Sequence, residues 1–120
     1  MGQRDDLKKI VLHYYQLVDA QNLDDLFSLF SDNVVYERSG NEPIIGIEEL
    51  KQFYKNSRII QRGEHKIIET IVSGDEVVVR GRFTGVLKDG RNVEFGFSDF
   101  FLFSNGKILK RFTYTDIGKV

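Results

Sequence analysis

FGFSDFFLF, residues 95–103, reads as a β-strand with a single acid, Asp99, at its centre. Successive side chains of a strand point to opposite faces of the sheet. One face then carries Phe95, Phe97, Asp99, Phe101 and Phe103. The other face carries Gly96, Ser98, Phe100 and Leu102. A carboxylate buried without a partner is so unfavourable that it takes up a proton or finds an opposite charge. The strand therefore predicts either a chemical site or a buried ion pair at Asp99.

Three glycine-containing turns divide the second half of the chain into strands. The turns are SGD at 73–75, DG at 89–90 and SNG at 104–106, and all are hairpin signals. They predict strands near 64–72, 76–88, 91–103 and 107–116. Before them, helical periodicity predicts three helices: one at 4–20, a shorter one that begins after the capping residue Asn22, and one at 46–56. A short strand is predicted at 33–39. Helices followed by a strand meander predict an α+β fold, with a curved antiparallel sheet wrapped around three N-terminal helices.

The DG turn predicts which residues lie opposite Asp99 on the preceding strand. With DG as a two-residue loop, counting back along the hairpin places Arg82 opposite Phe97 and Arg80 opposite Asp99. Directly opposed residues share one side of a sheet. Arg80 is therefore the expected ion-pair partner of Asp99.

The SNG turn leaves two registers open for the last strand. A three-residue loop aligns Asp99 with Arg111 and brings Thr113 to the same face. A two-residue loop places Phe112 and Tyr114 on that face instead.

Composition limits the class of protein. The 120 residues predict one domain, 1–120, and the net charge of −1 gives no electrostatic footprint for nucleic acid or an anionic membrane. Cysteine is absent, His13 and His65 are isolated and are expected on the surface, and no cofactor or metal motif is found. Neither a membrane-spanning run nor a signal peptide is found, so a cytoplasmic location is expected.

The stretch 19–57, DAQNLDDLFSLFSDNVVYERSGNEPIIGIEELKQFYKNS, resembles the ketosteroid isomerase and SnoaL-like branch of the nuclear-transport-factor-two-like superfamily. The family segments NAGDLD, ALFADD, VEDP, GSEP and FYANS correspond to DAQNLD, SLFSDN, YERS, GNEP and FYKNS. Farther on, DGRNVEFGFSDFFLF corresponds to the family stretch that ends in IDHFRF. The resemblance implies a cone-shaped sheet closed by three helices around a deep pocket.

The resemblance also implies roles for particular residues. The oxyanion-binding tyrosine and acid of the isomerases correspond to Tyr14 and Asp99, and that acid is kept protonated in ketosteroid isomerase. The general base of VEDP is replaced by Arg38, which cannot accept a proton at neutral pH. A shift of the following loop would bring Glu37 inward instead, so the two orientations remain open.

The implied pocket is cationic, which argues against a sterol ligand. The shorter SNG turn, compared with the isomerases, favours the three-residue loop. The residues expected to bind the ligand are Arg38, Arg80, Arg82, Phe97, Phe101, Arg111 and Thr113. The aspartates of limonene-epoxide hydrolases correspond to positions near Arg82 and Thr113, so that machinery is absent. The SnoaL-like cyclases use one aspartate, which Asp99 would supply.

Two functions follow as hypotheses. The first is an isomerase, cyclase or lyase acting on a small polar or anionic carbonyl compound. The second is a dimeric ligand-binding or carrier module without chemistry. A homodimer is expected because Phe83, Phe100 and Leu102 lie on the predicted outer face of the sheet. Asp99 is expected to be ionised and paired with Arg80.

Overall fold

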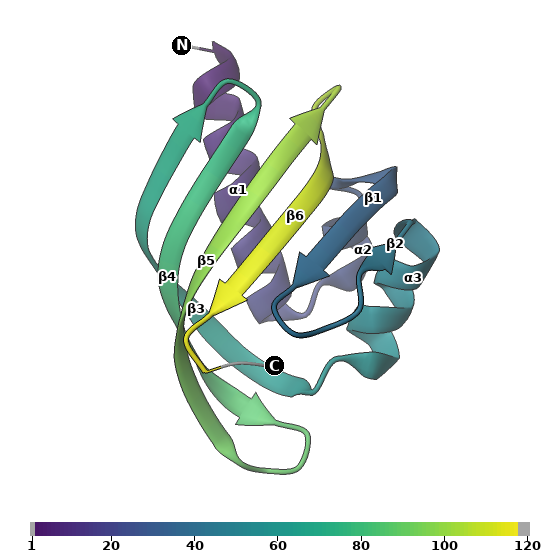
Figure 1. Ribbon diagram of the computed structural model, residues 1–120, viewed down its shortest axis with the longest axis vertical. Helices are drawn as coiled ribbons and strands as arrows, with labels where there is room; N and C mark the ends of the chain where they lie inside the picture. Colours follow the sequence, from purple (N-terminus) through teal and green to yellow (C-terminus); the bar gives the residue numbers. More distant parts are fainter. Residues whose placement is uncertain (1, 118–120) are drawn as a thin grey trace.

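The computed structural model describes residues 2–117, with side chains from residue 6 onward, and it has the predicted α+β fold. The helical segments are α1 (Gly2–Ala20), α2 (Leu23–Phe27), α3 (Ile47–Gln52) and a π-helical turn η1 (Phe53–Ser57). The strands are β1 (Phe30–Arg38), β2 (Ile44–Ile45), β3 (Ile60–Ser73), β4 (Glu76–Leu87), β5 (Asn92–Ser104) and β6 (Lys107–Thr115). They form one curved sheet in the order β2-β1-β6-β5-β4-β3, which curves around α1 (Figure 1). None of the helices in this part of the chain is long and apolar enough to cross a membrane.

The sheet is antiparallel except at one pair of neighbours. Strands β1 and β6 run parallel, with Tyr36 opposite Arg111 and Arg38 opposite Thr113. The expectation of a wholly antiparallel sheet is therefore corrected at this pair. The connection from β1 to β6 runs through α3 and four further strands, and a long connection of this kind permits parallel pairing, unlike a short hairpin. The two-residue strand β2 was not predicted.

The β4–β5 hairpin differs from the prediction by one residue. Leu87 donates its N–H to the carbonyl of Arg91 at 2.8 Å, and Gly90 donates to the carbonyl of Leu87 at 2.9 Å with φ of 93°. The loop therefore has three residues, 88–90, and ends with a left-handed glycine. A one-residue slip moves every side chain to the opposite face. Val79 rather than Arg80 lies opposite Asp99.

Three predicted positions change face because of this slip. Arg80 and Arg82 are 58% and 46% exposed on the outer face, where they pair with Glu69 and Asp116. Phe83, expected on that outer face, is instead 1% exposed in the core. The prediction that Arg80 and Arg82 line the pocket is wrong.

In the β5–β6 hairpin, Arg111 and Thr113 lie on the predicted face of the sheet, although the loop differs from the prediction. Its loop has two residues, Asn105 and Gly106, with φ of 53° and 76°, so the predicted three-residue loop is wrong. These angles fit the turn preferred in tight hairpins. The pairing then shifts by one residue between Leu102 and Phe103, which returns Arg111 and Thr113 to the inner face. Thr113 rather than Arg111 lies opposite Asp99.

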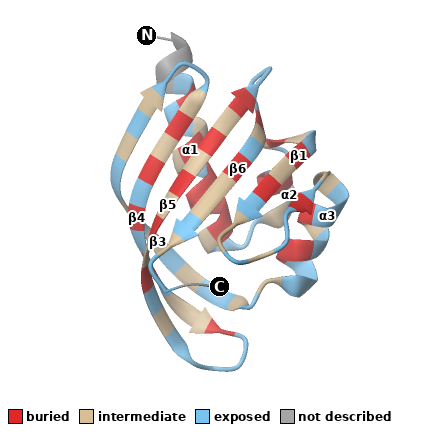
Figure 2. Ribbon diagram, in the orientation of Figure 1, coloured by how far each residue is buried: buried red, intermediate tan, exposed pale blue. Residues whose placement is uncertain are grey.

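The alternation predicted for β5 is confirmed. Asp99 is 0% exposed, and the four phenylalanines on its face are buried: Phe95, Phe97, Phe101 and Phe103 (Figure 2). Asp99 and Arg111 are the buried charged residues within the described part of the chain. The core is thus built around one acid and one arginine.

The third predicted helix, 46–56, is divided in two. The α-helix ends at Gln52 and continues as the π-helical turn, which closes when Arg58 donates its N–H to the carbonyl of Phe53 at 2.8 Å. The wider π turn, which occurs often at functional sites, leaves both Phe53 and Tyr54 buried. Asn22 precedes α2 as predicted, but its side chain donates to Asp25 at 2.9 Å and does not cap the helix.

Candidate functional site

Asp99 is held by three hydrogen-bond donors, one from α1 and two from β6. Arg111 Nη2 donates to Asp99 Oδ2 at 2.8 Å, and the Tyr15 hydroxyl donates to the same oxygen at 2.5 Å. The Thr113 hydroxyl donates to Asp99 Oδ1 at 2.6 Å. A carboxylate that accepts from three donors, one of them a guanidinium, fits the ionised form. The predicted buried ion pair therefore exists, with Arg111 in place of Arg80.

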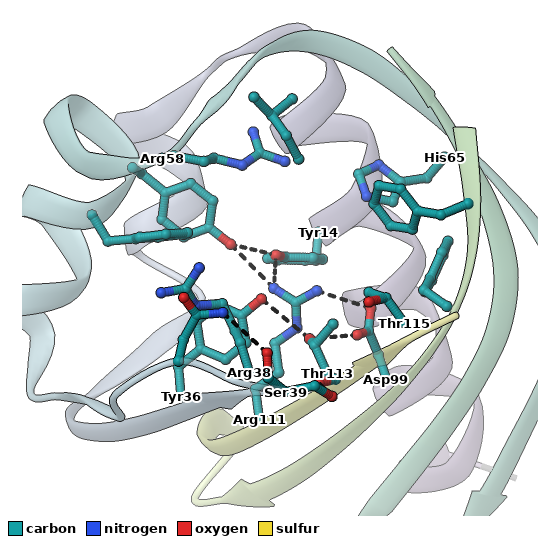
Figure 3. Close-up of a pocket in the computed structure, with 16 residues that line it drawn as sticks. Tyr14, Tyr36, Arg38, Ser39, Arg58, His65, Asp99, Arg111, Thr113 and Thr115 are labelled. Carbon is teal, nitrogen blue, oxygen red and sulfur yellow. Dashed lines mark hydrogen bonds and ion pairs between the residues drawn. The ribbon is translucent and has the colours of Figure 1, made fainter. Parts of the chain in front are cut away.

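Arg111 links the acid to a pair of tyrosines. Its Nη1 donates to the hydroxyl of Tyr14 and, at 3.1 Å, to that of Tyr54 (Figure 3). The two hydroxyl oxygens are 2.5 Å apart. Together they carry two hydrogens, and their mutual contact uses one. One O–H of the pair is therefore left to donate to another group, and both tyrosines line the cavity described below.

The Arg111 guanidinium is enclosed by aromatic rings. Its Cζ lies 4.6 Å from the ring centres of Tyr14 and Tyr36 and 5.2 Å from that of Phe101. The side chain is 5% exposed, and its Nε has no hydrogen-bond partner among the described residues. A buried N–H without a partner is uncommon in native proteins, and here the surrounding aromatic rings enclose the guanidinium that carries it.

Burial keeps the tyrosines of the site protonated. It raises the pKa of Tyr36 to about 12, although the charge of Arg111 acts in the opposite direction. It also raises the pKa of Tyr14 and of Tyr15 well above their usual value, with Asp99 adding to the effect at Tyr15. Burial opposes the charge of Arg111, but Asp99 and the surrounding tyrosines outweigh it and raise the arginine pKa. At neutral pH the site therefore presents neutral hydroxyl donors beside a fixed positive charge.

A cavity opens above this network. Its lining residues come from α1, β1 and the following loop, from η1 and the residue after it, and from strands β3, β5 and β6: Tyr14, Tyr36, Arg38, Ser39, Asn41, Phe53, Tyr54, Arg58, Ile60, His65, Phe95, Phe97, Asp99, Arg111, Thr113 and Thr115. About 60 Å³ of it can be occupied by the centres of water molecules, room for roughly four to six waters. The lining holds three arginines and one carboxylate, so the cavity is positively charged and small.

Most of the predicted ligand-binding residues meet at this cavity. Tyr14, Arg38, Phe97, Asp99, Arg111 and Thr113 line it. Phe101 does not, because it is fully buried beneath the Arg111 guanidinium. Arg38 faces inward with its Cζ 4.2 Å from the ring centre of Phe53. Glu37 is exposed, so the alternative in which Glu37 turns into the pocket is excluded.

The SnoaL-like domain model matches residues 11–111 of the chain. The chain belongs to the SnoaL-like domain family. No curated protein sequence matches it.

Several solved structures share the fold of this SnoaL-like chain. A candidate SnoaL-like polyketide cyclase from Jannaschia sp. CCS1 is 20% identical, with 98% of this chain and 90% of that chain covered and a TM-score of 0.84. An LEH-like epoxide hydrolase of M. tuberculosis is 18% identical, with 97% and 86% covered and a TM-score of 0.86. An NTF2-like protein of unknown function from Exiguobacterium sp. 255-15 is 26% identical, with 90% and 98% covered and a TM-score of 0.78.

The SnoaL-like pocket also contains residues that were not predicted. Tyr36 lies two residues before Arg38 on β1, so strand alternation alone would have placed it on the inner face. Arg58 follows the π-helical turn, and no sequence pattern signals that turn. His65, expected on the surface, is a lining residue with a side chain that is 10% exposed. Within the described residues, no group of three or more His, Asp or Glu side chains is arranged to hold a metal ion.

Proposed function

We propose that the protein binds a small anionic carbonyl compound in this pocket and acts on it as an isomerase, cyclase or lyase. The observation that carries the proposal is the charge of the lining, which contains three arginines and a single carboxylate. Asp99 already pairs with Arg111, and Arg58 is a further cation among the lining residues. A ligand carboxylate is one of the groups that arginine binds best, often through two parallel hydrogen bonds.

The neutral tyrosines provide a hydrogen-bond donor for the carbonyl group of the ligand, in addition to the arginines that bind its carboxylate. The spare O–H of the Tyr14–Tyr54 pair is a donor for a carbonyl oxygen, and the neighbouring Arg111 charge favours an oxygen that becomes negative. Asp99 acts through Arg111, because its own oxygens are already occupied by three donors. The structure from Jannaschia sp. CCS1 that shares this fold is a candidate polyketide cyclase, which supports the cyclase among the three proposed activities.

Arg58→Met is expected to weaken binding of a short oxo acid by about 10- to 150-fold. A hydrogen bond to a charged group contributes about 1.5–3 kcal/mol, and about 1.4 kcal/mol corresponds to tenfold in affinity. Titration calorimetry with α-ketobutyrate and acetoacetate, and with the matching amides, measures the effect. Arg91→Met is the control, because it removes the same charge from the exposed β4–β5 turn. Equal affinity of wild type for the acids and the amides would contradict the anionic ligand.

A carrier without chemistry is the alternative function. It is favoured by Arg38, which stands where the isomerase branch has its general base and cannot take a proton. The two functions differ in one measurement on the same ligand. Release of a changed compound after incubation supports the enzyme, while tight binding with full recovery of the ligand supports the carrier.

We further infer that the protein is a homodimer through the outer face of the sheet. Four apolar residues pair in a row across four strands of that face: Ile71, Val78, Phe100 and Phe112. The next row contains Glu69 beside Arg80, so both charges lie next to the apolar row. A patch with both charges can pair with itself in a two-fold dimer.

Ile71→Lys is expected to convert a dimer into a monomer at micromolar concentration. The side chain is 52% exposed, so the change adds a charge to the proposed interface without disturbing the core. Sedimentation velocity gives the mass of each variant. Ile45→Lys is the matched control, because Ile45 is 61% exposed on β2 and lies outside the row. A monomeric wild type would reject the dimer.

A further inference from the structure

A histidine and an aspartate form a pair at the edge of the pocket. Asp19 Oδ1 lies 2.6 Å from Nδ1 of His65, and Asp19 Oδ2 accepts the backbone N–H of His65 at 2.8 Å. The side chains are 23% and 10% exposed, respectively. Asp19 is near the C-terminal end of α1, where the helix dipole disfavours an acid. One carboxylate thus fixes both the backbone and the ring of His65.

The contact with Asp19 determines which ring nitrogen carries the hydrogen. An ionised carboxylate only accepts hydrogen bonds, so Nδ1 of His65 must be the donor. In a neutral imidazole the lone pair then lies on Nε2. The ring therefore has a defined tautomer with a basic nitrogen on the side away from Asp19.

The His65 ring belongs to the same cavity as the tyrosine and arginine donors. It lines that cavity, on the side across from Arg58 in Figure 3. Its centre lies 5.0 Å from the ring centre of Tyr15, whose hydroxyl reaches Asp99, and 5.4 Å from that of Phe97. Because the cavity is small, a ligand bound near the Tyr14–Tyr54 pair also lies close to His65.

We propose that His65, positioned by Asp19, is the proton acceptor of this pocket, acting on a carbon next to the carbonyl group of an oxo acid. The inference rests on the proposed function. The C–H bond breaks, an N–H bond forms at Nε2, and the electron pair moves into an enolate whose oxygen receives the spare tyrosine hydrogen bond. The proton returns from Nε2 to a carbon of the same compound. The step needs no oxidant, reductant or cofactor.

Asp19 stabilises the proton-bearing state of the ring. The imidazolium that forms during the step lies beside a carboxylate, an arrangement that also holds the ring in orientation. Asp19→Asn offers a test of this role with little change in shape. The amide oxygen can still accept the backbone N–H, while the amide NH₂ donates to Nδ1. The hydrogen then moves to Nε2, which loses its basic lone pair.

The first experiment reads the tautomer and needs no ligand. Two-bond ¹H–¹⁵N correlation spectra of the His65 ring are expected to show Nδ1–H in the wild type and Nε2–H in Asp19→Asn. A wild-type ring with the hydrogen on Nε2 would overturn the proposal, whatever the protein binds. The same spectra of His13, an exposed residue of α1, provide the internal reference.

The second experiment follows deuterium uptake in D₂O at the carbon next to the ketone, which is C3 of α-ketobutyrate and C2 of acetoacetate. His65→Gln and Asp19→Asn are expected to slow the wild-type exchange by about 10²–10⁴-fold, the usual contribution of a general base. His13→Gln is expected to exchange at the wild-type rate. Binding without exchange in the wild type, or full exchange in His65→Gln, would overturn the role of His65 while leaving the anion site intact. If calorimetry detects no binding of either acid, the proposed function fails, and this inference fails with it.

Discussion

Asp99→Asn is expected to lower the free energy of unfolding by about 3–5 kcal/mol, the range for breaking a buried ion pair from one side. Arg111 keeps its charge in the variant, yet its side chain is only 5% exposed and its counter-charge is gone. The new NH₂ group also replaces one of the two carboxylate oxygens, so it faces either the Thr113 hydroxyl or the Tyr15 and Arg111 donors. Urea unfolding followed by circular dichroism measures the change.

Two further variants show whether the loss comes from the buried charge. Asp116→Asn removes an acid whose Oδ2 lies 3.8 Å from Arg82 Nη1 on the outer face, and it is expected to change stability by less than about 1 kcal/mol. Asp99→Asn combined with Arg111→Met removes both charges and is expected to be more stable than Asp99→Asn alone. If Asp99→Asn unfolds like the wild type but no longer binds ligand, Asp99 is a neutral donor, as in the isomerases.

The inner face of β5 could be predicted from sequence because the signal lies within one strand. Phenylalanine recurs at every second position around Asp99, and a period of two over nine residues indicates a β-strand with one buried face. The same reasoning assigns Arg38 to the pocket and Glu37 to the surface once β1 is recognised. The presence of a partner for Asp99 also followed, since a buried acid needs one.

The identity of that partner could not be predicted because it depends on two small details of backbone geometry. A DG sequence fits loops of two or three residues, and the choice moves Arg80 from one face to the other. At the next hairpin the loop was mispredicted by one residue, and a shift at Leu102 and Phe103 restored the face of Arg111. The error at the first loop therefore placed Arg80 on the wrong face of the sheet. The error at the second loop left Arg111 on the predicted face.

His65 was missed for a different reason. Its partner Asp19 lies 46 residues earlier, and neither residue belongs to a local pattern. Only the packing of α1 against β3 brings the two together. The absence of nearby polar residues in the sequence therefore does not show that a histidine lies on the surface. Here the last turn of a distant helix supplies the acid, Asp19, that binds His65.

The protein is expected to unfold cooperatively between about pH 10 and pH 12. Folding raises the pKa of Tyr36 from 10.0 to about 12, and it also raises those of Tyr14 and Tyr15. Below pH 10 these hydroxyls are protonated in both the folded and the unfolded chain, so their contribution is fully present. As the pH rises further, only the unfolded chain releases these protons, and the free energy of unfolding falls.

The size of the effect follows from the number of tyrosines involved. Each group that is protonated only in the folded state lowers the free energy of unfolding by about 1.4 kcal/mol per pH unit, so three lower it by about 4 kcal/mol per unit. Circular dichroism and tyrosinate absorbance, recorded on the same samples, should change together. Tyr36→Phe removes one of the three groups and should reduce the slope by about one third.

Titration of Tyr14, Tyr15 and Tyr36 at constant circular dichroism would contradict this account, because it would mean that these buried hydroxyls lose their protons in the folded protein. The outcome bears directly on the pocket. The burial that opposes tyrosinate also keeps Tyr14 and Tyr36 as neutral O–H groups beside a permanent arginine charge. A site of that kind stabilises an oxygen that gains negative charge, since its donors are fixed before the charge appears. The alkaline instability and the proposed activation of a carbonyl compound therefore have the same physical origin.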